Sequence, residues 1–143
     1  MSLVALRRIS LAYVKRQQAM PVDYVIENEY MELILRGDYS AEELTSARKA
    51  AAADPAFKAP MKLLINALEA TRNLSYETIE QRIGLLVPVK KLYAPYWVIL
   101  AEQGSLIFGL GRMFASMIER EGIEVDVFSD RESALKALVA KNS

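Results

Sequence analysis

Two short apolar runs, each flanked by segments of helical character, constrain the fold of this chain more than any other feature. LLINAL, at 63–68, and YWVILAE, at 96–102, have the length and composition of strands that are buried on both faces. A helix between two single strands indicates a crossover connection, so these strands are predicted to lie parallel in one sheet. The chain of 143 residues has the length of one compact domain.

Alternation and capping signals indicate the elements of the first half. VDYVIEN and YMELILRG, at 22–28 and 30–37, alternate apolar with polar residues, which predicts two strands joined by a tight hairpin. Ser40 and Glu43 form a capping box before an alanine-rich helix. A second helix is predicted to begin near Ser75.

The second half adds a long helix after Gly104 through Glu121, the strand IEVDVF at 123–128, and a closing helix capped by Ser129 or Asp130. The predicted order is β-β-α-β-α-β-α-β-α. It gives an α/β fold with one five-stranded mixed sheet and about four helices, because crossovers require parallel strands. The last four strands are predicted to be parallel, and the first is predicted to be antiparallel to its neighbour.

Composition excludes most familiar catalytic chemistry. The chain has no cysteine and no histidine, so it lacks thiolate nucleophiles, disulfides and the commonest metal ligands. It also lacks the side chain best suited to proton transfer at neutral pH. The carboxylate pairs Glu27/Glu29 and Glu119/Glu121 are interpreted as solvated faces rather than acid-base pairs. We therefore predict no catalytic residue, no metal site, no cofactor and no enzyme activity.

The zero net charge hides an uneven distribution of charged residues. Residues 1–20 contain no acidic residue, which leaves 14 basic against 18 acidic residues in the remainder, predicted as a domain at 21–143. An acidic domain without a basic stripe predicts no binding to nucleic acid. The basic residues of the N-terminal segment are Arg7, Arg8, Lys15 and Arg16.

This N-terminal basic segment at 1–20 is predicted to be helical, with three interpretations. It is a basic arm that contacts an anionic membrane or a partner. Alternatively, it is an accessory helix packed on the domain or on a second copy. The third interpretation is a translated extension ahead of a natural start at Met20.

The junction between the LLINAL strand and the next helix is a candidate anion site. Asn73 and Ser75 lie where free backbone N–H groups and the helix dipole favour an anion. Ligands of open α/β sheets bind at the carboxyl ends of the strands. Ser75 is therefore either a phosphorylation or phosphate-contact site, or simply the N-cap of the helix.

The helix predicted after Gly104 is apolar over a wide arc. Its glycines have the wrong spacing for a dinucleotide fingerprint and are interpreted as positions of close packing on the sheet. The apolar arc is interpreted as core, but because methionine adapts to irregular partners it also suits an apolar ligand pocket or a dimer face. The candidate pocket residues are Ile107, Leu110, Phe114 and Met117.

The segment KKLYAPYW, at 90–97, combines two cations with aromatic rings, a mixture found at membrane interfaces. The alternative is a loop whose lysines meet the preceding helix end and whose aromatic rings cover the sheet edge. The candidate membrane or partner contacts are Lys90, Lys91, Tyr93, Tyr96 and Trp97.

The stretch AEQGSLIFGLGRMFASMIEREGIEVDVFSDRESALKAL, at 101–138, is similar to a known family pattern. That pattern is a strand, an apolar glycine-containing helix with Arg-Met-Phe, then V-x-V-F and an acidic start to the last helix. Over about residues 21 to 140 the chain resembles the STAS fold of anti-sigma-factor antagonists. It resembles most the SpoIIAA-like group, also described as STAS-like and CRAL-TRIO-like.

Phosphorylatable STAS antagonists carry Asp-Ser-Ser-Gly-Leu at the start of the second helix. The resemblance places Ser75 at the phosphoserine, with Leu74 at the Asp, Tyr76 at the second Ser and Glu77 at the Gly. Glu77 would repel an added phosphate, which argues against regulation by a serine kinase. The CRAL-TRIO side of the resemblance implies instead a fold that binds a lipid-like molecule.

From these features we expect a cytoplasmic, non-catalytic bacterial STAS-like module that binds a protein partner and forms a homodimer. The alternative is a protein that binds a lipid or a small apolar ligand and associates peripherally with a membrane. Its pocket would lie under the helix at 105–119. An enzyme is not favoured, because no convergent titratable groups are present in the sequence pattern.

Overall fold

The structure is a computed structural model that describes residues 20–141. The predictions for the N-terminal basic segment at 1–19 lie outside the described residues. The described chain forms a single five-stranded sheet with the order β1-β2-β3-β4-β5. The strands are β1 (Val22–Ile26), β2 (Tyr30–Gly37), β3 (Met61–Ala70), β4 (Tyr93–Leu100) and β5 (Glu124–Phe128).

Four α-helices and two short 3-10 helices connect or follow these strands within the described part of the chain. They are α2 (Ala41–Ala52), α3 (Tyr76–Leu86), η1 (Val87–Leu92), α4 (Leu106–Ile118), η2 (Glu119–Glu121) and α5 (Arg131–Lys141). The strand β1 pairs with β2 in antiparallel orientation, and the other three pairs are parallel. The predicted order of elements and the predicted strand directions are therefore confirmed.

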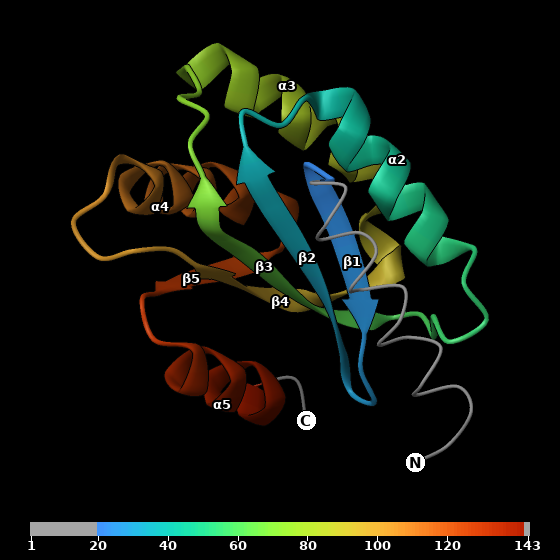
Figure 1. Cartoon of the computed structure of the whole chain (residues 1–143). Helices are drawn as coiled ribbons and strands as arrows, with labels where there is room; N and C mark the ends of the chain where they lie inside the picture. The colour runs from blue at the N-terminus through green and yellow to red at the C-terminus, as the bar shows by residue number, and fades with distance from the viewer. Residues whose placement is uncertain (1–19, 142–143) are drawn as a thin grey trace.

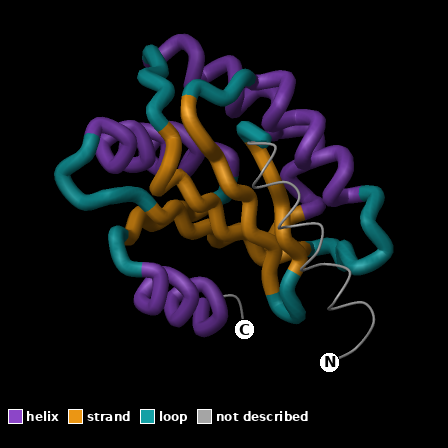
Figure 2. Tube along the Cα trace, viewed as in Figure 1, coloured by secondary structure: helices purple, strands orange, loops and turns teal. Residues whose placement is uncertain are grey.

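The helices cover the two faces of the sheet unequally (Figures 1 and 2). Each parallel connection moves one strand further in the same direction across the sheet. Because such crossovers are right-handed, α2, α3 and α4 pack on the same face. The C-terminal helix α5 packs on the other face, against β3, β4 and β5. We call these the three-helix face and the α5 face.

Side-chain caps begin the helices where the sequence predicts them. Ser40 accepts a hydrogen bond from the backbone of Glu43, whose side chain accepts one from the Ser40 N–H, so the capping box is present. Ser105 caps α4 in the same way through the Phe108 N–H. The carboxylate of Asp130 accepts from the backbone N–H of Ser133 at 3.0 Å, which caps the last helix.

Element boundaries differ from the sequence prediction most clearly in β3, β4 and α4. The strand β3 extends beyond LLINAL at both ends, and β4 begins at Tyr93 rather than at Tyr96. The register between β3 and β4 is irregular between Met61 and Leu63, which accommodates Pro95 within β4. The long helix ends at Ile118, and η2 continues the chain to Glu121.

The hydrophobic core is divided between the two faces of the sheet. On the three-helix face, Met31, Leu33, Leu63 and Trp97 are among the most deeply buried side chains. The α5 face has a smaller core of strand residues packed against Ala134 and Leu138 of α5. Alternating strand residues therefore serve opposite layers, as the predicted burial on both faces requires.

One of the two glycines of α4 lies against the sheet. A Cβ atom on Gly111 would lie 3.3 Å from a methyl carbon of Val127 and 3.5 Å from one of Ile99. Gly111 therefore allows α4 to approach the sheet closely. A Cβ on Gly109 would meet nothing within 4 Å, so the predicted packing role is wrong for that residue.

Candidate functional site

A cavity of about 130 Å³ lies between the sheet and the helices of the three-helix face. Its floor is formed by side chains of β2, β3 and β4, and its walls by α2, α3 and α4. Most of the lining is aliphatic or aromatic, including Leu33, Leu44, Ile65, Ile79, Leu110 and Phe114. An engineered cavity of about 150 Å³ with a similar lining binds benzene. This cavity therefore has room for a small ring or a short acyl segment.

Small residues on the sheet and on α4 leave this space unfilled. Ala67 and Ala70 of β3 and Gly111 of α4 all line the cavity and contribute little side-chain volume. Ile65, in the central strand, is only partly buried although helices cover its face, whereas its neighbour Leu64 is fully buried. Incomplete packing over Ile65 is unusual for a protein interior, which is normally filled.

The structure places three of the four candidate pocket residues at this cavity. Ile107, Leu110 and Phe114 of α4 line it. Met117 lies one turn further along α4 and packs against the hydrophobic core beside the cavity instead. The ring of Phe114 stacks on Trp97, with centroids 6.3 Å apart, so these two rings form one aromatic wall. The apolar arc of this helix thus serves both as core and as cavity wall.

Three arginines also line the cavity, and the sequence analysis missed them. Arg48 comes from α2, Arg72 from the connection between β3 and α3, and Arg82 from α3. None of the described residues that line the cavity is acidic. Three positive charges therefore face a space whose lining offers no carboxylate.

The helical spacing of apolar residues in the sequence indicates that two of these arginines face the core. Arg48 is four residues after Leu44 and three residues before Ala51, both of which contribute to the buried face of α2. Arg82 is three residues after Ile79 and four residues before Leu86, which both contribute to the core on that face. Arginine in phase with an apolar stripe predicts a cation that points toward the core. No comparable pattern marks Arg72, which lies in a loop.

The three guanidinium groups have few hydrogen-bond partners. Arg72 donates to the carboxylate of Asp38 at 3.0 Å, and the Arg82 guanidinium lies 4.9 Å from the centre of the Tyr39 ring. Arg48 makes a long hydrogen bond of 3.4 Å to the hydroxyl of Thr45. In each of the three, the Nε atom is buried and has no hydrogen-bond partner among the described residues. Unused donors thus belong to residues that line a largely apolar cavity.

Arg48 is the most deeply buried of the three, with 8% of its surface exposed. Burial lowers the pKa of its guanidinium, because desolvation disfavours the charged form. The pKa of the neighbouring Tyr93 hydroxyl is raised by burial, an effect that the Arg48 charge opposes. A buried cation normally has a charged or strongly hydrogen-bonded partner. The polar contacts of Arg48 within the described part of the chain are the hydroxyl groups of Thr45 and Tyr93, and none of them is a carboxylate.

The candidate anion residues Asn73 and Ser75 lie in the connection that precedes α3. Ser75 is the N-cap of this helix, and its Oγ accepts from the Thr78 N–H at 3.2 Å. Both residues are exposed. Their neighbours Arg72 and Leu74 turn toward the cavity and line it. The capping role of Ser75 is thus observed, whereas phosphorylation stays a prediction.

The predicted surface patch of KKLYAPYW does not form. Tyr93, Tyr96 and Trp97 are buried, because β4 begins at Tyr93 and carries their side chains into both cores. Lys90 donates to the backbone carbonyl of Glu121 at 3.0 Å, so it fastens the end of η1 to η2. Lys91 is exposed. The combination of aromatic rings and cations was therefore wrong as a surface feature.

The length and hydropathy of the helices bear on whether the described chain crosses a membrane. None of the helices formed by the described residues is both long and apolar enough to cross a bilayer.

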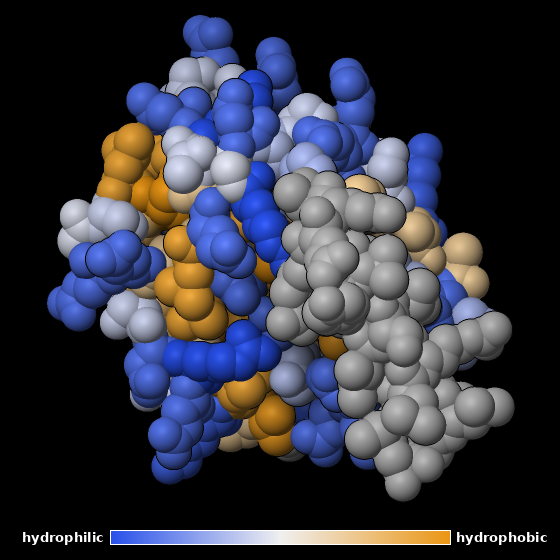
Figure 3. Space-filling model, in the orientation of Figure 1, coloured by the Kyte–Doolittle hydropathy of each residue, from blue (hydrophilic) through white to orange (hydrophobic). Residues whose placement is uncertain are grey.

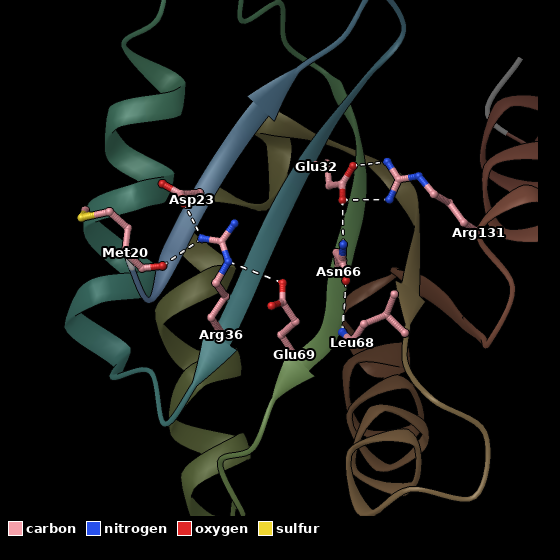
Figure 4. Close-up of polar contacts among 8 residues, drawn as sticks. All are labelled: Met20, Asp23, Glu32, Arg36, Asn66, Leu68, Glu69 and Arg131. Atoms are coloured by element: carbon pink, nitrogen blue, oxygen red, sulfur yellow. Dashed lines mark hydrogen bonds and ion pairs between the residues drawn. The ribbon is translucent and has the colours of Figure 1, made fainter. Parts of the chain in front are cut away.

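The α5 face carries two polar clusters, both of which are internally paired (Figure 4). Arg36 contacts the carboxylates of Asp23 and Glu69. Glu32 accepts hydrogen bonds from Arg131 and from Asn66. Because these groups satisfy one another, the clusters are best explained as packing contacts of the sheet. Among the described residues, no group of acidic side chains could hold a metal ion.

Comparisons with known proteins bear on the fold. No protein-family model matches the sequence, and no curated protein is significantly similar to it. A solved structure of an uncharacterised DUF3478-family protein from Shewanella loihica, described as having a SpoIIAA-like fold, matches with a TM-score of 0.57. The two sequences are 21% identical, and the match covers 82% of this chain and 91% of that chain. The described domain therefore has the SpoIIAA-like fold that its sequence resembles.

Proposed function

We propose that this domain is a non-catalytic STAS-like module that binds a small, largely apolar ligand in the cavity of the three-helix face. The observation that carries the proposal is the cavity itself, which is lined by apolar side chains on the floor and on all three helices. Ligand sites are typically concave and apolar, with a few polar groups at fixed positions. Of the two functions expected from the sequence, ligand binding thus has more structural support than the binding of a protein partner.

The position of Trp97 provides a direct assay. It is the only tryptophan of the chain, and it lines the cavity with its ring stacked on Phe114. Its indole N–H donates to the backbone carbonyl of Ala94 at 2.8 Å, so the ring is fixed in place. A ligand that enters the cavity will contact this ring and change its fluorescence.

The test is a titration of the full-length protein with octanol and with octanoate, followed by tryptophan fluorescence. We expect a saturable change with at least one of them. Ala67→Leu fills the cavity from the floor and is expected to abolish this change, whereas Ala50→Leu, at an exposed position of α2, leaves it unaltered. If neither compound produces a saturable change in the wild-type protein, the proposal fails.

A protein-binding role has a separate observation in its favour. On α4, Leu106 and Met113 expose 59% and 39% of their surface. Figure 3 shows apolar side chains at the surface on the left of the view, where α4 lies in Figure 1. If this face forms the predicted homodimer, sedimentation velocity will show a dimer that Leu106→Ser converts to a monomer. A wild-type monomer at high concentration would rule out this dimer.

A further inference from the structure

We propose that the ligand carries an acidic oxygen group, and that Arg48, Arg72 and Arg82 supply the anion-binding groups of the cavity. This inference rests on the proposed function and assigns the chemical class of its ligand, an anionic amphiphile. A carboxylate and a phosphate share the chemistry that these arginines recognise.

The first support is the convergence of charge from separate elements. The three arginines lie on α2, on α3 and in the connection before α3, and their positions are unrelated in sequence. They nevertheless line one cavity, and the described lining residues include no acidic side chain. The only carboxylate that a described contact gives to any of them is that of Asp38, which pairs with Arg72 and is largely exposed. The cavity therefore has an excess of positive charge.

The second support is the unused hydrogen-bonding capacity at the cavity. The Nε atoms of all three arginines are buried without a partner among the described residues. Buried polar groups are satisfied in the great majority of cases, so three unsatisfied donors at one cavity require an explanation. An anion in the cavity would accept hydrogen bonds from these donors and would neutralise part of their charge.

The third support is the arrangement of polar and apolar lining. A guanidinium presents Nε and a neighbouring Nη along one planar edge, which matches two oxygens of a carboxylate or phosphate. Arg48 is 8% exposed, whereas the Arg72 side chain is 35% exposed. The arginines thus extend from a buried position toward the surface, beside apolar side chains such as Ile65 and Phe114. The lining thus offers cations for an anion and apolar side chains for hydrocarbon.

The experiment compares three ligands that share one chain, with the full-length protein and Trp97 fluorescence as the readout. Octanol, octanoate and octyl phosphate each contain eight carbon atoms, and in octanoate the eighth carbon belongs to the carboxylate. We expect the better of the two acids to bind at least about tenfold more tightly than octanol, the effect of one charge-assisted contact. The order of octanoate and octyl phosphate identifies which acid the site accommodates better.

Variants assign this preference to the arginines. Arg48→Met keeps much of the side-chain volume but removes the charge, and is expected to reduce the preference for acids while octanol still binds. Arg120→Met is the matched control, because Arg120 lies on the surface in an exposed pair with Glu80. Its preference should equal that of the wild type. If Arg48→Met does not fold, Arg72→Met and Arg82→Met test the same expectation.

The outcomes separate the two proposals. If octanol binds as tightly as both acids, the inference of an acidic ligand is overturned while the proposed ligand-binding function stands. The inference of an acidic ligand is also overturned, and the proposed function stands, if every arginine variant that folds retains the full preference for acids. If none of the three compounds binds, the proposed function itself fails. Loss of the preference in the arginine variants, with octanol binding retained, supports both.

Discussion

The guanidinium of Arg131, in the first turn of α5, makes two hydrogen bonds to the carboxylate of Glu32, in the middle of β2 (Figure 4). The two residues are 99 positions apart in the sequence. Glu32 is buried and also accepts a hydrogen bond of 2.9 Å from Asn66 of β3. The hydrogen bond to Glu32 raises the pKa of Arg131. This contact fastens the C-terminal helix to the centre of the sheet.

Loss of this pair is expected to destabilise the domain. Arg131→Met leaves the buried Glu32 carboxylate without its cation, which should lower the free energy of unfolding by about 2 kcal/mol. This value is below the usual cost of breaking a buried pair, because Arg131 itself is half-exposed. Urea unfolding followed by circular dichroism measures it. Lys141→Met, which breaks an exposed pair with Glu124, should change stability little by comparison; equal effects would contradict a special role for Glu32.

The two glycines of α4 should respond differently to alanine. Gly109→Ala gains helix propensity without a new contact and should stabilise the domain by up to about 1 kcal/mol. Gly111→Ala gains the same propensity but places a Cβ atom 3.3 Å from Val127, so it should be less stable than Gly109→Ala. Paired urea titrations compare them. Equal stabilisation by both substitutions would show that α4 shifts freely over the sheet.

Removal of the N-cap of α3 provides a test of Ser75 as a structural residue. Ser75→Ala removes the hydroxyl that accepts from the Thr78 N–H and should cost about 1 kcal/mol of stability. Ser75→Asp retains a capping oxygen and should stay near the wild-type value. Thermal unfolding of the three proteins measures the difference. If Ser75→Ala unfolds like the wild type, the capping explanation of this residue is wrong.

Stability should decrease at alkaline pH. Burial, and then the hydrogen bond to Asp126, raises the pKa of the Tyr96 hydroxyl above its ordinary value of 10.0. Above that pH the unfolded chain loses this proton while the folded protein keeps it, so the unfolded state is favoured as pH rises. The stabilising contribution is complete below pH 10.0 and is lost above it. Urea unfolding across this range should show a shallower pH dependence for Tyr96→Phe, and an unchanged slope would contradict the assignment to this residue.

The order of elements was predictable because each strand has a recognisable pattern in its own stretch of sequence. The buried strands β3 and β4 appear as apolar runs, and serine caps mark the starts of α2 and α3. The start of β4 was missed because Pro95 follows it closely, and proline is disfavoured inside strands. The structure accommodates it through an irregular register against β3. Tyr93 was consequently placed outside the strand, and both Tyr93 and Trp97 were offered as candidate surface contacts, although both are buried.

The candidate site was predictable only in part, for a physical reason. Ile107, Leu110 and Phe114 belong to one helix, so their common face follows from helical spacing alone. The arginines belong to three elements, and their convergence depends on how those elements pack. Sequence periodicity shows which side of its own helix a residue occupies. It does not show which residues of other helices lie opposite.

The uniform direction of the strand order has a consequence for how the proposed ligand preference could change. In sheets whose strand order reverses, a crevice opens at the reversal and loops line it. Here β2 to β5 follow one another without reversal, so the cavity lies among packed helix and strand side chains. A change in ligand size then requires a change in core volume. Under the proposed function, ligand preference and folding stability therefore depend on the same residues, and new specificities must evolve within the limits that packing sets.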